Sequence, residues 1–319
     1  MENKIDRLPK AFLERLEKIL PADQLASALV TFSLPKPASF RVNLLKIPEE
    51  ALVEKLARQG FLLEKAPQIP HAFILKDRYL RELQETSSYR EGEIYVQSLS
   101  SMIPPQVLDP RPGERILDMT AAPGSKTTQM AVLMEGRGQI LANDNSRVRF
   151  FKMKANIEQQ GAPNIELSLR PGESFGRHSP GRFDKVLLDA PCSTEGKFYT
   201  AKPSSFAYWS PAKVREMVSK QKRLFFSAVH ALRAGGLLVY STCTFAPEEN
   251  EGVIDWALEK FGESLSVEPI ELSLPNRMDG ITDWERGHYA PAVRETCRIL
   301  PTETMEGFFV AKLRKKREA

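Results

Sequence analysis

The sequence predicts an α/β fold in which a small α+β module precedes a doubly wound, mostly parallel sheet. Three observations favour this class. From Gly92 onwards, apolar strand segments alternate with helical segments at the spacing of a parallel sheet. The runs 186–188 and 237–240 are unbroken apolar stretches, which is typical of interior strands. Before residue 90, short strands and short helices occur without that regular alternation.

The composition is that of a globular enzyme. Of the 319 residues, 42% are hydrophobic and 27% are charged, which excludes a disordered protein. No apolar stretch approaches the roughly 20 residues of a membrane-spanning helix, and residues 1–4 begin no signal peptide, so we expect a cytoplasmic protein without membrane contact. Three cysteines without Cys-x-x-Cys spacing and four scattered histidines predict neither disulfides nor a metal site. The net charge of +4 permits a polyanionic partner.

The amino-terminal third predicts short elements. Apolar residues at helical spacing over 8–34 indicate two helices broken at Pro21. Alternation over 39–44 predicts a strand, Pro48 opens a helix that ends before Gly60, and 72–75 is another strand. Five basic residues of this region are candidates for phosphate contacts, although a solvated face explains them equally simply: Arg41, Lys46, Lys76, Arg78 and Arg81.

The remainder predicts the parallel sheet and its helices. Strands are expected at 115–119, 138–144, 164–169, 183–189 and from 237 onwards, and helices at 97–108, 125–133, 146–160 and 211–233. Sheets of this kind bind ligands outside the carboxyl ends of their strands, where the strand order switches. Candidate functional residues are therefore sought at those ends.

The first strand ends in a glycine-bearing turn, 118–127, that lets the backbone approach a ligand closely. It is not the phosphate-binding loop of ATPases, because Ser125 separates Gly124 from Lys126, and Gly-x-Gly-x-x-Gly is absent too. With these two nucleotide motifs excluded, the ligand expected at this turn is a nucleoside with few phosphates. Asp144, at the end of the second strand, is the acid expected on ribose hydroxyls, the alternative being a helix cap.

Two of the three cysteines follow apolar strands. Cys192 comes after 183–189, and Cys243 ends the run 237–242. Either they are small buried hydrophobic residues, which is the usual role of a free cysteine, or they meet at one edge of the sheet for chemistry. Position alone leaves both open.

Three sequence blocks resemble a known family. DMTAAPGSKT, LLDAPCSTEG and YSTCTFAPEENE, in this order, are similar to the signature blocks of the RNA 5-methylcytosine methyltransferases of the Sun family. Lesser matches at 40–43, 95–98, 208–210 and 306–311 extend the resemblance over nearly the whole chain. It implies a Rossmann-like core with a mostly parallel seven-stranded sheet, S-adenosyl-L-methionine as cofactor, and methylation of carbon 5 of a cytosine in rRNA or tRNA.

The resemblance also implies roles for the candidate residues. Cys243 is the nucleophile that adds to carbon 6 of cytosine, and Cys192 helps the product leave. Asp189 forms hydrogen bonds to the amino group and ring nitrogen of the cytosine. Lys126 either lowers the pKa of a thiol or keeps Asp189 ionised. The cofactor residues are Thr120, Ala121, Ala122, Pro123, Gly124, Ser125, Lys126, Asp144 and Asp189. Because the fourth and fifth strands are neighbours in such sheets, the two cysteines should lie about 5 Å apart or a little more.

The chain departs from the family pattern twice. Thr120 stands where the family usually has cysteine, and Pro171-Gly172 stands where it commonly has the Asp-Gly that meets the adenine. Arg170 and Glu173 are the candidate substitutes for that contact.

Three rival functions differ in testable ways. DNA cytosine-5 methyltransferases attack with the cysteine of the Pro-Cys block, here Cys192, but need a large recognition insert, whereas only about seventy residues follow Cys243. A non-catalytic RNA-binding factor would need none of these residues together. A small-molecule or protein methyltransferase would need no thiol at the end of the fifth strand.

The remaining expectations concern domains and flanking segments. We expect an RRM-like RNA-recognition module with its helices over 1–90, a methyltransferase domain over 91–319, RNA as partner, and a monomer. The acids at 247–251 are interpreted as first-turn residues that complement a helix dipole, and Cys297 as packing. For the basic segment 312–317, RNA contact and simple solvation stay open.

Overall fold

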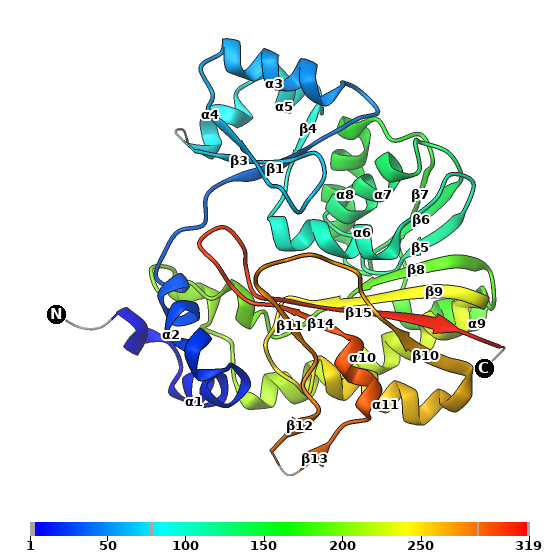
Figure 1. The fold of residues 1–319 in the computed structure, drawn as a ribbon. Helices are drawn as coiled ribbons and strands as arrows, with labels where there is room; N and C mark the ends of the chain where they lie inside the picture. Colours follow the sequence, from blue (N-terminus) through cyan, green and yellow to red (C-terminus); the bar gives the residue numbers. More distant parts are fainter. Residues whose placement is uncertain (1–3, 77–78, 286, 318–319) are drawn as a thin grey trace.

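A computed structural model describes residues 4–76, 79–285 and 287–317. Figure 1 shows a small module of residues 39–96 above a larger core, with the first two helices placed beside the core rather than beside the module. No described helix is both long enough and apolar enough to cross a membrane.

The first helices are α1 (Lys10–Ile19) and α2 (Ala22–Thr31), after a 3-10 turn at Lys4–Arg7. The break at Pro21 is as predicted, because proline has no amide proton to continue α1. Both helices pack on the core: the Phe12 ring lies 4.8 Å from that of Phe198 and touches Phe32 edge-on. These contacts attach the amino terminus to the loop that carries Cys192.

The module is a four-stranded antiparallel sheet in the order β2-β3-β1-β4. Its elements are β1 (Ser39–Val42), α3 (Glu49–Arg58), β2 (Leu63–Lys65), β3 (Ala72–Leu75), α4 (Leu80–Gln84), α5 (Ser87–Arg90) and β4 (Ile94–Val96). Phe40, Leu52 and Leu56 form its separate apolar core. Because β4 pairs with β1, this sheet continues past residue 90, where we placed the end of the module.

The core is built on a nine-stranded sheet in the order β11-β14-β15-β9-β8-β5-β6-β7, with β10 beside β15. Its strands are β5 (Arg115–Asp118), β6 (Gln139–Asn143), β7 (Ile165–Ser168), β8 (Phe183–Asp189), β9 (Leu232–Thr242), β10 (Leu265–Glu268), β11 (Arg277–Asp279), β14 (Cys297–Ile299) and β15 (Phe308–Lys315). The five strands β7, β6, β5, β8 and β9 are parallel, and the other four pair antiparallel. The α/β class is confirmed, but the sheet has nine strands rather than seven.

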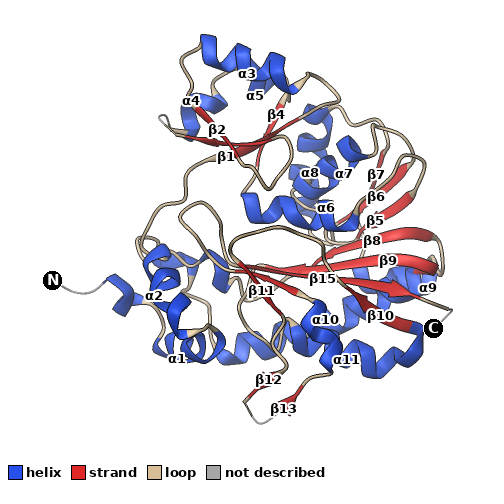
Figure 2. Ribbon diagram, viewed as in Figure 1, coloured by secondary structure: helices blue, strands red, loops and turns tan. Residues whose placement is uncertain are grey.

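Helices cover both faces of this sheet (Figure 2). They are α6 (Ile103–Leu108), α7 (Ser125–Leu133), α8 (Arg147–Gln160), α9 (Phe175–His178), α10 (Pro211–Ala231) and α11 (Glu251–Phe261). Successive residues of a strand face opposite sides, so Leu188 packs with Phe225 of α10 while Leu187 packs with Ile103 of α6. Two short strands, β12 (Asp283–Trp284) and β13 (Gly287–His288), pair with each other. The remaining elements are 3-10 turns at 99–102, 172–174, 195–197, 203–205, 262–264 and 291–295.

The segment 312–317 is not a tail. Residues 312–315 belong to β15, which lies between β9 and β14 in the sheet. Lys315 is buried and donates to the Leu232 carbonyl at 2.7 Å, and Lys312 lies 3.7 Å from Glu268. Arg317 pairs with Glu263 at 3.1 Å. Packing thus uses this segment, whereas we expected RNA contact or solvation. Cys297 is fully buried in β14, which confirms its packing role.

Arg41 is buried as well, so neither of the two alternatives, a phosphate contact or a solvated face, holds for it. Its guanidinium donates to Gln97 Oε1, the Ser125 carbonyl and Thr128 Oγ1, at 3.0, 3.0 and 2.7 Å. Lys46 donates to the carbonyls of Glu91 and Gln159. Of the other expected phosphate contacts, Lys76 and Arg81 pair with glutamates on the surface, and Arg78 lies outside the described residues.

Candidate functional site

The carboxyl ends of β5, β6, β8 and β9 bring the predicted site residues together. Two neighbouring cavities of about 150 and 360 Å³ open there, and Thr120, Arg149 and Asp189 line both. The smaller cavity also contacts Asp144, Cys192 and Cys243. The larger cavity continues towards β4 of the module.

The two cysteines face each other across the ends of β8 and β9. Their sulfur atoms lie 3.3 Å apart, closer than the 5 Å that strand spacing predicts, because Cys192 sits on a loop that turns back towards β9. Both side chains are half-buried at the smaller cavity.

The thiols are electrostatically unequal. The hydrogen bond from Cys192, helped by the positive charge of Lys197, lowers the pKa of the Cys243 thiol against the effect of its burial. The same hydrogen bond, with burial, raises the pKa of Cys192. Of the two thiols, Cys243 is therefore the one that loses its proton more readily.

Asp189 and Lys126 form an ion pair next to the thiols. Lys126 Nζ lies 2.6 Å from Asp189 Oδ2 and 2.8 Å from Ser101 Oγ, while Ser241 Oγ donates to Asp189 Oδ1 at 2.8 Å. This contact places Lys126 on Asp189 rather than on either thiol. Lys197, which the sequence motifs did not single out, is the lysine whose charge acts on Cys243.

The glycine-bearing turn connects β5 to α7 above the larger cavity. Thr120 Oγ1 donates to the Asp189 carbonyl at 2.8 Å, so this threonine ties the turn to β8. Gly124 has φ +100°, a conformation that side-chain-bearing residues rarely adopt, and it precedes the first turn of α7. Residues 120–123, 125 and 126 line the larger cavity.

Asp144 is buried at the smaller cavity and does not cap α8. It accepts a hydrogen bond from the Ser146 amide at 2.9 Å and lies 3.3 Å from Arg149, whereas Ser146 is the N-cap residue. Of the two candidates for the adenine contact, Glu173 lines this cavity. The Arg170 guanidinium instead lies over the Phe175 ring, 5.2 Å from its centroid.

Asp118 is a site residue that our candidate set does not include. It lines the larger cavity, only 1% of it is exposed, and Thr127 Oγ1 donates to its Oδ2 at 2.6 Å. Its Oδ1 has no partner among the described residues, and burial raises the pKa of the carboxyl to about 7. The sequence offered one signal for Asp118: it is an acidic residue that ends a buried strand and has no basic residue next to it.

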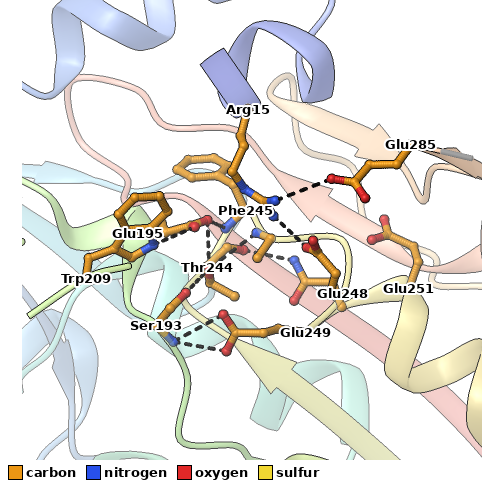
Figure 3. Close-up of polar contacts among 12 residues, drawn as sticks. Arg15, Ser193, Glu195, Trp209, Thr244, Phe245, Glu248, Glu249, Glu251 and Glu285 are labelled. Carbon is orange, nitrogen blue, oxygen red and sulfur yellow. Dashed lines mark hydrogen bonds and ion pairs between the residues drawn. The ribbon is translucent and has the colours of Figure 1, made fainter. Parts of the chain in front are cut away.

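Of the acids at 247–251, only Glu251 lies in the first turn of a helix. Glu248 and Glu249 precede α11, which begins at Glu251. Glu248 pairs with Arg15 at 2.6 Å and Glu249 accepts from the Ser193 amide (Figure 3). Glu251 is held by Arg298. The first-turn interpretation is therefore confirmed for Glu251 and wrong for Glu248 and Glu249, which lie before the helix.

No three His, Cys, Asp or Glu side chains of the described residues are grouped so that they could hold a metal ion. The chemistry this arrangement can perform is that of a thiolate beside a second thiol and an aspartate–lysine pair, at the edge of a cavity fit for a nucleoside.

Comparison with known families covers nearly the whole chain. Residues 105–314 match the family described as 16S rRNA methyltransferase RsmB/F, and residues 8–99 match the N-terminal domain of 16S rRNA methyltransferase RsmF. These matches agree with the resemblance that the three sequence blocks indicated.

Individual relatives give the same picture. The ribosomal RNA small subunit methyltransferase F of Cronobacter sakazakii is 37% identical over 97% of this chain and 63% of its own length, so the chain spans less than two thirds of that relative. The tRNA (cytosine(49)-C(5))-methyltransferase of Pyrococcus abyssi is 40% identical over 98% of this chain and 97% of the relative. A solved methyltransferase homolog from Pyrococcus horikoshii has a TM-score of 0.83 and 32% identity, covering 99% of both chains.

Proposed function

Since the chain belongs to the RsmB/F family of 16S rRNA methyltransferases, we propose that it methylates carbon 5 of a cytosine in rRNA or tRNA through a covalent adduct. The observation that carries the proposal is the pair of sulfurs 3.3 Å apart beside Asp189 and Lys126, because methylation at carbon 5 needs one group to attack and another to help release. The names of the two relatives above support RNA as the substrate.

The residues at the two cavities fit S-adenosyl-L-methionine, which when bound supplies the electrophilic methyl group. The buried Oδ1 of Asp118 is an acceptor without a partner among the described residues, and an α-ammonium group would satisfy it. Thr120, Ala121, Ala122, Pro123, Gly124, Ser125 and Lys126 form the turn that would face the methionine part. Asp144 would hold the ribose hydroxyls, and Glu173 takes the adenine contact of the missing Asp-Gly.

Attack is assigned to Cys243. Its thiolate adds to carbon 6 of the base, which makes carbon 5 nucleophilic enough to take the methyl group. Asp189 accepts a hydrogen bond from the cytosine amino group, and its ion pair with Lys126 holds the carboxylate in place.

Release is assigned to Cys192. The proton on carbon 5 leaves, the electron pair of that C–H bond forms the C5=C6 double bond, and the C6–S bond breaks with its electrons returning to Cys243. Once Cys243 is a neutral thioether, its hydrogen bond with Cys192 weakens, and that hydrogen bond is the first cause of the raised Cys192 pKa. Cys192 can then lose its own proton to water and accept the one from carbon 5.

The module of β1–β4 is proposed as the RNA platform. Its last strand and the turn after it contribute Tyr95, Gln97 and Ser98 to the larger cavity, opposite Lys126 and Lys197 of the core. An RNA strand lying in this cleft would present a base turned out of its stack towards Cys243.

The roles of the two cysteines are tested by substituting each with alanine and incubating the protein with cofactor and RNA. We expect Cys243→Ala to abolish covalent protein–RNA adducts and Cys192→Ala to let them accumulate. The reverse pattern would assign attack to Cys192, as in the DNA enzymes. A wild-type protein that transfers no tritiated methyl to RNA would favour a non-catalytic binding factor.

A further inference from the structure

The loops that carry the two thiols are joined by two buried carboxylates (Figure 3). Glu195, on the Cys192 loop, accepts hydrogen bonds from Thr244 Oγ1 and the Phe245 amide, at 2.9 and 3.0 Å. Glu249, on the Cys243 loop, accepts from the Ser193 amide at 3.0 Å. Each loop thus supplies the carboxylate that binds the backbone of the other.

Both carboxylates are buried and neither forms an ion pair within the described part of the chain. Burial raises the pKa of Glu249 to about 8 and raises that of Glu195 as well. No ion pair among the described residues offsets the free energy cost of burying the two acids, although the charge of Arg15 acts on Glu195, and what they contribute is hydrogen bonds that fix the loop backbones.

The two thiols depend on these bonds to different degrees. Cys243 directly follows β9, whose last residue Thr242 is paired with Phe309 of β15. Cys192 lies three residues beyond the end of β8, on a loop with no strand pairing of its own. The sheet holds Cys243 in place, whereas Cys192 needs other supports.

Two side chains bind the backbone on either side of Cys192. Gln221 of α10 donates to the Pro191 carbonyl at 2.9 Å, and Glu249 accepts from the Ser193 amide. Gln221 Nε2 also donates to Glu249 Oε2 at 2.7 Å, so the two act as one unit. Tyr240 fixes the Glu249 backbone through a 2.6 Å hydrogen bond to its carbonyl.

We propose that Glu249, together with Gln221, is the positioning residue for Cys192 and that it governs release of the RNA rather than attack upon it. The inference rests on the proposed function, in which Cys192 accepts the carbon-5 proton. With Cys192 displaced, the C5–H and C6–S bonds stay intact and the enzyme stops at the methylated adduct. Attack by Cys243 continues, because β9 still holds it.

The test follows single turnovers with end-labelled RNA on denaturing gels, in parallel with thermal unfolding. The variants are Glu249→Ala and Gln221→Met, with Cys192→Ala as reference. Glu249→Gln keeps an oxygen that accepts from Ser193, and Glu248→Gln is the matched neighbour. We expect Glu249→Ala and Gln221→Met to form the adduct at close to the wild-type rate and to release it about tenfold more slowly, the effect of a lost buried hydrogen bond. Glu249→Gln and Glu248→Gln should release RNA as the wild type does.

The outcomes separate the two proposals. Adduct accumulation in Cys192→Ala but not in Glu249→Ala or Gln221→Met would overturn this inference alone. Equal losses of attack and release, in step with a lower melting temperature, would also overturn it, because that is the result of a merely structural role. If Cys192→Ala accumulates no adduct, the proposed function fails and the inference fails with it. Should Glu249→Ala not fold, Gln221→Met decides.

Discussion

Asp118 connects stability and ligand binding through a single buried carboxyl. Its pKa rises from 3.8 to about 7 on folding because of burial, so between these values the folded state holds a proton that the unfolded chain has released. The free energy of unfolding therefore falls as pH rises through this window. The same unpaired Oδ1 is what would attract an α-ammonium group.

Asp118→Asn should uncouple these two effects. We expect the variant to gain a few degrees of melting temperature over the wild type between pH 5 and pH 8, and to bind S-adenosyl-L-methionine about tenfold or more weakly. Thermal scans at both pH values and calorimetric titration measure this. Asp184→Asn is the control of opposite sign, because hydrogen bonds from Arg115 and Arg233 lower the pKa of Asp184 against its burial. An unchanged pH trend in Asp118→Asn would contradict the account.

After the hydrogen bond with Cys192, the charge of Lys197 contributes to the lowered pKa of Cys243. Lys197→Ala should therefore shift the acid limb of the adduct-formation rate to higher pH. At neutral pH we expect about tenfold slower attack, equivalent to roughly 1.4 kcal/mol. Lys202→Ala, an exposed lysine on the same loop, should leave the profile in place. A uniform loss without a shift would show that Lys197 acts otherwise.

At the scale of elements, the first turn of α11 is fixed by a buried ion pair. Arg298 of β14 binds both oxygens of Glu251, and its Nη1 donates to the Phe245 carbonyl at 2.9 Å. The pair joins α11 and β14 to the loop after Cys243, and both side chains are almost fully buried.

Arg298→Met should lower the free energy of unfolding by about 3–5 kcal/mol, because it leaves Glu251 buried without its partner. Urea denaturation measures the loss, and the double variant Arg298→Met/Glu251→Gln should recover part of it. Arg81→Ala breaks an exposed pair with Glu85 and should change stability by less than about 1 kcal/mol. Equal effects of the two single variants would contradict this role.

Local patterns predicted the elements that the molecule builds locally. The apolar runs of β8 and β9, the proline break at Pro21 and the glycine turn at Gly124 all follow from properties of a few adjacent residues. Distant partners decided the rest. Residues 312–315 resemble a basic tail in the sequence, but Lys312 and Arg314 pair with Glu268, and Lys315 donates to the Leu232 carbonyl. Glu249 resembles a first-turn acid, but it binds the amide of the distant Ser193.

The same distinction applies to the candidate site. The resemblance of the three sequence blocks predicted that Cys192, Cys243, Asp189 and Lys126 would meet, because the carboxyl ends of neighbouring parallel strands share one edge. Strand spacing could not predict the 3.3 Å between the sulfurs, which depends on how the loop after β8 folds back.

At the scale of the whole molecule, Arg41 attaches the module to the core. From β1 it reaches Ser125 and Thr128 of α7, and Asn43 of the module donates to the Gln160 carbonyl at the end of α8. These contacts set the width of the cleft in which the RNA is proposed to lie. The module therefore has one defined placement relative to the thiols.

Arg41→Met should loosen that placement. We expect an increase of about tenfold in the KM for RNA and a smaller loss of cofactor affinity, because misplaced substrate-positioning elements are costly, whereas among the cofactor residues only Ser125 loses a hydrogen bond from Arg41. Steady-state kinetics with RNA, and cofactor titration, measure the two effects, with Lys76→Ala on the module surface as control. Weaker cofactor binding with an unchanged KM would contradict this division.

The central claim is that Cys243 bonds to the target base. The most direct measurement is to trap the protein on RNA that contains 5-fluorocytosine in the presence of S-adenosyl-L-methionine, digest the complex, and locate the modified peptide by mass spectrometry. We predict a methylated nucleotide on Cys243 and an unmodified Cys192. A nucleotide on Cys192, or no covalent complex from a protein that still methylates RNA, would contradict the account.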